Sequence, residues 1–108
     1  MVEEIMKNVY RIEVPLPENP LKALNSYLIR GSERCLLVDT GFNWVECKEA
    51  QLNGLAELGV EMSQVDFFLT HVHGDHSGLL YELASPESTV FCSQTDWDIL
   101  LACMSRNY

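Results

Sequence analysis

The sequence contains little positive charge and no long apolar run. Seven Lys and Arg residues stand against sixteen Asp and Glu residues, which gives a formal net charge of −9. Binding to nucleic-acid phosphates requires clustered Lys and Arg, so we expect no nucleic-acid partner. No apolar stretch approaches the roughly 20 residues that a membrane-spanning helix needs, and residues 1–4 do not begin a signal peptide. We therefore expect no membrane partner.

Cysteine occurs at four positions but never in the C-x-x-C spacing of thiolate metal sites and redox motifs. The positions are Cys35, Cys47, Cys92 and Cys103. We expect free, mostly buried thiols in a reducing compartment, and therefore a cytoplasmic protein. A disulfide between two of these cysteines remains an open alternative.

Histidine is absent from the whole sequence except for one short segment that follows a strand-like stretch. The segment holds three histidines and an aspartate within six residues: His71, His73, Asp75 and His76. Before it, residues 65–70 form an apolar, aromatic-rich run typical of a buried strand. After it, residues 77–83 have helical spacing. We expect the segment to be a loop between a strand and a helix, where functional residues are commonly held.

The spacing of these side chains favours a metal site. In extended backbone, residues two apart point the same way, so His71 and His73 can bind one ion. Gly74 lets the chain turn sharply, and Asp75 and His76 then offer an oxygen and a nitrogen ligand. The chain is too short for all four to surround one ion, which favours two adjacent metal positions or one ion with ligands from elsewhere. Such mixed ligation suits Zn, Fe or Mn. The alternative is a set of solvated loop histidines with a capping aspartate.

The run Thr70-His71-x-His73-x-Asp75-His76 resembles the H-x-H-x-D-H signature of the metallo-β-lactamase superfamily. Residues 36–41, with the sequence LLVDTG, resemble the first motif of that superfamily, a strand that ends in Asp-Thr-Gly. The resemblance implies an α/β fold: a mixed sheet with packed helices, half of an αββα sandwich. Its later ligands, including a further His, have no counterpart, because no histidine follows His76. We expect residues 1–108 to be the N-terminal part of such a domain.

For the intact protein, the resemblance implies a metal-dependent hydrolase with a small-molecule substrate. Two zinc ions would activate water for attack on an ester, thioester, lactone or amide carbonyl, since zinc lowers the pKa of bound water to roughly 7. His71 and His73 would hold the first ion, and Asp75 and His76 the second. Asp75 would also orient the attacking water and is the expected catalytic residue.

Asp39 ends an apolar strand-like run, upstream of the histidine segment. A carboxylate at a strand end can simply accept hydrogen bonds from the amides of the following turn. Beside a metal loop, we expect Asp39 instead to hold the loop in place without binding the metal itself.

Other functions remain open. An iron-dependent oxidoreductase of the same superfamily could carry the same signature, although its flavodiiron branch resembles H-x-E-x-D where this chain has His73. A non-catalytic, metal-free scaffold could also keep the motif. The 108-residue chain by itself has two ligands for each proposed ion, where a zinc site needs at least three, so we expect this fragment to be inactive.

The remaining pattern predicts the order of elements. We expect strands at 8–14, 26–30, 34–39, 65–69 and 89–92, an exposed loop at 16–23, and helices at 44–58, 78–83 and from 95 onward. The apolar runs at 36–38 and 67–69 are typical of strands covered on both faces. Half a sandwich would leave one of these faces exposed, so we expect the fragment to self-associate through its sheet.

Overall fold

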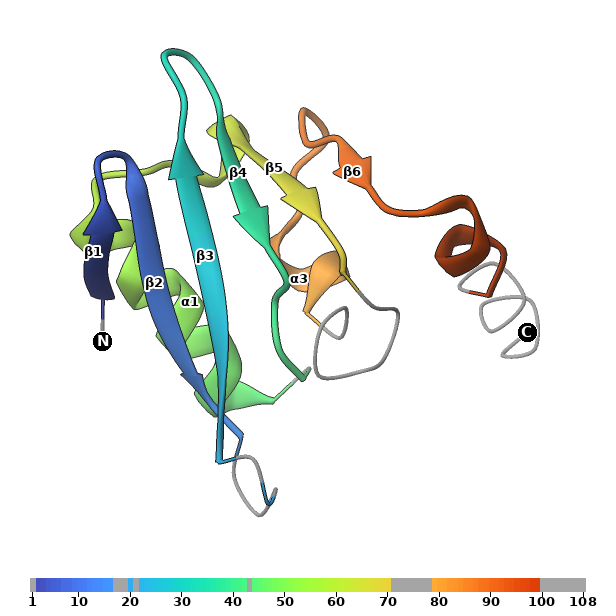
Figure 1. The fold of residues 1–108 in the computed structure, drawn as a ribbon, viewed down its shortest axis with the longest axis horizontal. Helices are drawn as coiled ribbons and strands as arrows, with labels where there is room; N and C mark the ends of the chain where they lie inside the picture. The colour runs from blue at the N-terminus through green and yellow to red at the C-terminus, as the bar shows by residue number, and fades with distance from the viewer. Residues whose placement is uncertain (1, 17–19, 21, 43, 71–78, 100–108) are drawn as a thin grey trace.

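A six-stranded mixed sheet forms the centre of the computed structural model, which describes residues 2–16, 20, 22–42, 44–70 and 79–99. The strands lie side by side in chain order (Figure 1): β1 (Val2–Met6), β2 (Val9–Pro15), β3 (Ala23–Arg30), β4 (Cys35–Val38), β5 (Val65–Phe68) and β6 (Val90–Phe91). The strands β1 to β4 pair antiparallel, whereas β4–β5 and β5–β6 pair parallel. The structure confirms the expected α/β fold with a mixed sheet.

Helical crossovers explain the parallel half of the sheet, because parallel neighbours require a long connection. Helix α1 (Val45–Glu57) and the 3-10 turn Met62–Gln64 connect β4 to β5. The short helix α3 (Leu80–Leu83) lies between β5 and β6. None of the helices in the described part of the chain is long and apolar enough to cross a membrane.

The strands predicted at 26–30 and 34–39 form an antiparallel hairpin, β3 and β4. Leu28 of β3 lies opposite Leu37 of β4, and the amide of Gly31 donates to the carbonyl of Arg34 at 2.9 Å to close the turn. The predicted loop at 16–23 is wrong at both ends. Leu16 is buried in the core, and Ala23 already belongs to β3 because it pairs with the end of β2.

One face of the sheet is covered by helix and contributes the core. Figure 1 shows α1 behind the strands. The core joins buried strand residues to both helical segments: Ile12, Val14, Leu28, Leu37, Val65 and Phe67 pack with Cys47, Leu55, Leu79 and Leu83. A Cβ at Gly54 would lie 3.0 Å from Cγ2 of Ile12, so this glycine allows α1 to approach β2 closely.

The buried face of α1 differs from the apolar face that its sequence indicates. Val45 and Leu52 are 68% and 42% exposed, whereas Cys47, Gln51 and Leu55 are buried. The buried residues follow the four-residue repeat of one helix face, with a polar residue in the middle. Gly59 ends the helical segment as expected, at φ +70, with Val60 donating back to the carbonyl of Leu55.

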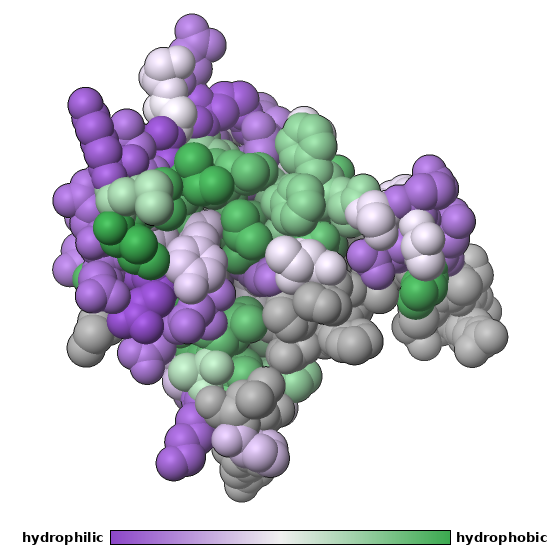
Figure 2. All heavy atoms as spheres, viewed as in Figure 1, coloured by the Kyte–Doolittle hydropathy of each residue, from purple (hydrophilic) through white to green (hydrophobic). Residues whose placement is uncertain are grey.

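The opposite face of the sheet remains open. Ile29, Phe68 and Phe91 are 41%, 40% and 49% exposed, and Leu36 and Val38 are half-buried. Figure 2 shows apolar side chains gathered over the middle strands, on the face that α1 does not cover. The strands predicted to be covered on both sides are therefore covered on one side by the described residues, and the apolar face expected of half a sandwich is exposed.

The last described helical residues, 94–99, begin earlier than predicted. The hydroxyl of Ser93 accepts a hydrogen bond from the amide of Asp96 at 3.1 Å, and the carbonyl of Ser93 accepts one from Trp97. Ser93 is therefore the N-cap, two residues before the expected cap, Thr95.

Candidate functional site

The carboxyl ends of β4 and β5 meet at one edge of the sheet, since the two strands are parallel and Val38 lies opposite Phe68. Asp39 follows β4, and its amide donates to the carbonyl of Phe68 at 2.9 Å. Thr70 lies two residues beyond the end of β5. Ligands bind outside the carboxyl ends of strands in open α/β sheets, so this edge is the first place to look for a site.

Asp39 binds Thr70 through both oxygens of its carboxylate. The amide of Thr70 donates to Oδ1 at 2.8 Å, and the hydroxyl of Thr70 donates to Oδ2 at 2.6 Å. Asp39 itself has φ +64, a left-handed conformation that aspartate tolerates better than most residues. The turn at the end of β4 therefore directs a nearly buried carboxylate onto the residue that precedes His71.

Ser26 supports this turn from the neighbouring strand β3. Its buried hydroxyl lies 2.9 Å from the carbonyl oxygen of Asp39 and 3.1 Å from that of Val38, and can donate to either. These carbonyls lie where β4 ends, and buried carbonyls need a donor. The sequence analysis did not identify Ser26. Ser26 lies between Leu24 and Leu28 at two-residue spacing, and a polar residue between such apolar neighbours is the signal that could have found it.

Thr40 connects the same turn to two other segments. Its hydroxyl accepts a hydrogen bond from the amide of Leu79 at 3.2 Å, and its carbonyl accepts one from Nε2 of Gln51 at 2.9 Å. Thr40 and Gln51 are fully buried. Oε1 of Gln51 has no hydrogen-bond partner within the part of the chain that the structure describes. The sequence analysis did not identify either residue as part of the site.

Gly41 lets the turn close against the core. It has φ +118, and an added Cβ would lie 3.0 Å from Cγ1 of Val14 and 3.3 Å from Cβ of Cys47. The thiol of Cys47 donates to the carbonyl of Pro15 at 3.0 Å. Burial raises the pKa of the Cys47 thiol, which keeps it protonated and therefore a poor metal ligand at neutral pH.

The predicted metal ligands His71, His73, Asp75 and His76 lie outside the described residues. The structure describes what holds the two ends of their segment: Thr70 before it and Leu79 after it. Among the described residues, no group of three His, Cys, Asp or Glu side chains could hold a metal ion. Any metal at this edge therefore needs ligands from outside the described set.

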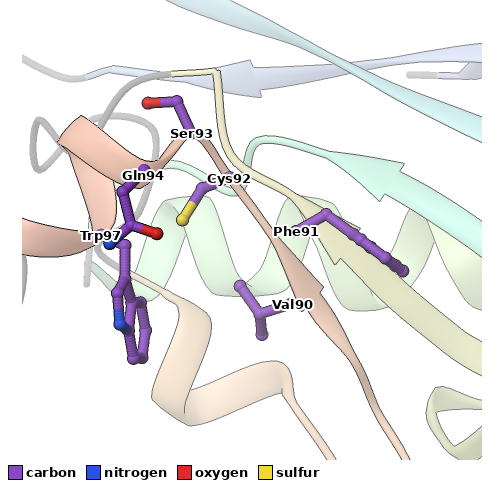
Figure 3. A pocket seen from close by; sticks show the side chains of 6 residues that line it. All are labelled: Val90, Phe91, Cys92, Ser93, Gln94 and Trp97. Carbon is purple, nitrogen blue, oxygen red and sulfur yellow. The ribbon is translucent and has the colours of Figure 1, made fainter.

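A hollow of about 280 Å³ lies at the end of β6, on the same edge of the sheet because β4, β5 and β6 are parallel. Its lining comes from the end of β6 and the helical residues after it (Figure 3): Val90, Phe91, Cys92, Ser93, Gln94 and Trp97. The side chain of Phe91 points away from that of Cys92. The lining is mixed: apolar Val90, Phe91 and Trp97 lie beside polar Ser93 and Gln94.

Comparison with known proteins identifies the family. Residues 20–91 match the family model described as the metallo-beta-lactamase superfamily. The chain belongs to the metallo-beta-lactamase superfamily. The match includes the Asp39–Thr40–Gly41 turn and the whole H-x-H-x-D-H segment, and it confirms the resemblance seen in the sequence. The superfamily generally binds metal ions, often zinc.

Curated relatives include proteins with hydrolase names. The lactamase-like protein ptaB of Pestalotiopsis fici is 38% identical over an alignment of 81 residues, which covers 71% of this chain and 24% of the relative. An atrochrysone carboxyl ACP thioesterase of Claviceps purpurea is 36% identical over 81 residues, with the same coverage of 71% and 24%. The chain thus spans about a quarter of the length of these relatives.

Solved structures of the superfamily share the fold. A metallo-beta-lactamase family protein from Thermus thermophilus aligns with a TM-score of 0.68 at 36% identity, over 76% of this chain and 28% of that protein. The metallo-beta-lactamase GOB-18 from Elizabethkingia meningoseptica aligns with a TM-score of 0.73 at 23% identity, over 92% of this chain and 34% of that protein. At that identity, the second likeness concerns the fold alone.

Proposed function

We propose that the intact protein is a metal-dependent hydrolase. The observation that carries the proposal is the pair of hydrogen bonds between Asp39 and Thr70, at 2.8 Å and 2.6 Å. They fix the residue directly before an H-x-H-x-D-H motif, at the ligand-binding edge of an α/β sheet, in a chain of the metallo-beta-lactamase superfamily. A sheet that anchors the base of a ligand-bearing loop is what a metal centre requires.

The donor set of the motif fits zinc. Three imidazoles and one carboxylate without thiolate suit this ion, although iron or manganese would also be accepted. In this proposal His71 and His73 hold one ion, Asp75 and His76 hold a second, and Asp75 orients the attacking water. In this proposal Asp39 is not a ligand but holds the loop in place, through the hydrogen bonds that its two oxygens accept from Thr70. When bound, zinc supplies a water of lowered pKa, roughly 7, as a nucleophile near neutral pH.

We further propose a thioester as the substrate class, within the wider set of esters, thioesters, lactones and amides. Support comes from the thioesterase of Claviceps purpurea and a second atrochrysone carboxyl ACP thioesterase, from Emericella nidulans, which is 34% identical over 80 residues. The alternatives are an iron-dependent oxidoreductase and a metal-free scaffold. Metal analysis identifies the scaffold, and turnover of a thioester separates the hydrolase from the oxidoreductase.

The direct test is hydrolysis of a model acyl thioester by the intact protein, measured by the release of the free thiol. We expect turnover that a chelator abolishes and added zinc restores. The double variant His71→Ala/His73→Ala should be inactive, whereas Glu57→Gln, an exposed change on α1, should match the wild type. Turnover that survives both chelation and the double substitution would contradict the proposal. We propose that residues 1–108 alone are inactive, since they supply two ligands per ion.

We also propose that residues 1–108, taken alone, self-associate through the open sheet face, with a second copy as the partner. Support comes from the exposed side chains of Ile29, Phe68 and Phe91 on that face. A two-fold dimer would bury one apolar patch on both copies at once. The net charge of −9 opposes association, so salt should strengthen it.

A cytoplasmic location remains our proposal for the protein. It is supported by free thiols at Cys35, Cys47 and Cys92, of which the first two are buried. Free cysteines are typical of a reducing compartment.

A further inference from the structure

Two adjacent residues of one turn hold both ends of the segment 71–78. The carboxylate of Asp39 binds Thr70, the last residue before the segment. The hydroxyl of Thr40 accepts a hydrogen bond from the amide of Leu79, the first residue after it, at 3.2 Å. The residues on both sides of this eight-residue segment are therefore hydrogen-bonded to the same turn, at the end of β4.

We propose that Thr40 is a positioning residue for the metal site, and that Gln51 fixes Thr40 from helix α1. This inference rests on the proposed function, because the segment between the two held ends carries the four proposed ligands. Thr40 would act through the backbone of Leu79 and would touch neither the metal nor the substrate.

The physical basis is preorganisation. Ligands bind a metal tightly when their loop is already held in the binding geometry, since less conformational entropy is then lost on binding. A segment held at one end keeps more conformations than a segment held at both. Removal of groups that orient metal ligands typically lowers metal affinity 10- to 100-fold, and Thr40 acts one step further away, so we expect an effect of about ten-fold.

Packing alone would hold Leu79 near the core, because its side chain is fully buried with Leu83. The hydrogen bond to the hydroxyl of Thr40 adds a directional contact, which fixes the position and orientation of the Leu79 backbone. Loss of packing would lower stability in general, whereas loss of this contact should lower metal affinity more than stability.

Gln51 links this turn to the helix layer. Its Nε2 donates to the carbonyl of Thr40 at 2.9 Å, while its Oε1 is buried without a partner among the residues that the structure describes. Gln51 thereby joins helix α1 to the residue next to Asp39.

The test compares variants of the intact protein that differ in this hydroxyl. Thr40→Val keeps the shape of the side chain and removes the hydroxyl, Thr40→Ser keeps the hydroxyl, and Gln51→Leu removes the donor to Thr40. Val65→Ala is the control, since Val65 is a core residue at the opposite end of β5. Zinc affinity is measured by competition with a chromophoric chelator, the Co²⁺ absorption spectrum reports ligand geometry, and urea unfolding of the metal-free protein reports stability.

We expect Thr40→Val to raise the zinc Kd about ten-fold and to alter the Co²⁺ spectrum. Gln51→Leu should also raise the Kd and alter the spectrum. Thr40→Ser should restore wild-type values, and Val65→Ala should lower stability without a change in Kd. A wild-type Kd and Co²⁺ spectrum in folded Thr40→Val would overturn the inference while the proposed function stands. If Thr40→Val does not fold, Gln51→Leu decides in the same way. A wild-type protein that binds no zinc would overturn the proposed function and this inference together.

Discussion

Asp39 and Thr70 are joined by two hydrogen bonds, although 31 residues separate them in the sequence. One bond fixes the backbone of Thr70 and the other fixes its side chain, so both the position and the rotation of this residue are set. His71 is the next residue. The end of one strand therefore determines where the proposed ligand segment leaves the next strand.

Asp39→Asn tests this contact. The amide keeps the shape of the carboxylate and tolerates the left-handed backbone at φ +64, but it is neutral and has a single acceptor oxygen. We expect the free energy of unfolding to fall by about 1 kcal/mol, because the charge-assisted hydrogen bonds to Thr70 become neutral ones. Urea unfolding measures this change. A double-mutant cycle with Thr70→Val should show coupling, and strictly additive effects would count against the contact.

Gly41→Ala tests the close approach of the turn to the core. A side chain at φ +118 is strained, and its Cβ would lie 3.0 Å from Val14. We expect a loss of roughly 1–3 kcal/mol in the free energy of unfolding. Gly59→Ala is the control: Gly59 has φ +70, at the left-handed region that other residues can adopt, and an added Cβ would meet nothing within 4 Å. Equal losses for the two variants would show that packing against Val14 contributes nothing.

Asp66→Asn tests the pH dependence of stability. Asp66 accepts hydrogen bonds from Arg34 at 3.0 Å and 2.9 Å, and these lower the pKa of the Asp66 carboxyl in the folded protein. A lowered folded pKa gives stability that is present above the unfolded value of about 3.9 and is lost as the pH falls through the folded pKa. The stability difference between wild type and variant should therefore shrink below about pH 4. A difference that stays constant on acidification would contradict this assignment.

The open sheet face predicts association of residues 1–108. Static light scattering at tens of micromolar should give a mass above that of the monomer, and added salt should increase it because the chain is strongly acidic. Phe68→Ser/Phe91→Ser should shift the mass toward the monomer, since both side chains are on the exposed face. Val45→Ser, a change at an exposed apolar residue of α1, should have no effect. A monomeric wild type that binds no apolar dye would sink the proposed interface.

Patterns of adjacent residues in the sequence predicted the parts of the fold that are determined by residues close together in the chain. The hairpin of β3 and β4, the strand before the histidine segment and the stop at Gly59 follow from turn residues and apolar runs. β1 was missed, because its glutamates hide the strand pattern and only its pairing with β2 defines it. Leu16 was expected in an exposed loop, yet the path of the chain after β2 carries it into the core.

The site was predictable only where its residues bear recognisable chemistry. Asp39 was identified because it ends an apolar strand upstream of the histidine segment, in a run that resembles the first superfamily motif, and the structure joins it to Thr70. Ser26 and Gln51 were missed because their importance depends on burial, which the sequence shows only indirectly. Gln51 lies midway between Cys47 and Leu55 at four-residue spacing, and a polar residue inside such a stripe is the signal to look for.

Elemental analysis of the intact protein, purified without chelator, tests the metal assignment most directly. We expect one to two transition-metal ions per chain, as the number of ligands in the motif indicates, with zinc as the proposed ion. His71→Ala/His73→Ala should lose the ion of the first position, and Glu57→Gln should keep the full content. An intact protein without metal, or a double variant with unchanged metal content, would contradict the assignment of these histidines as ligands.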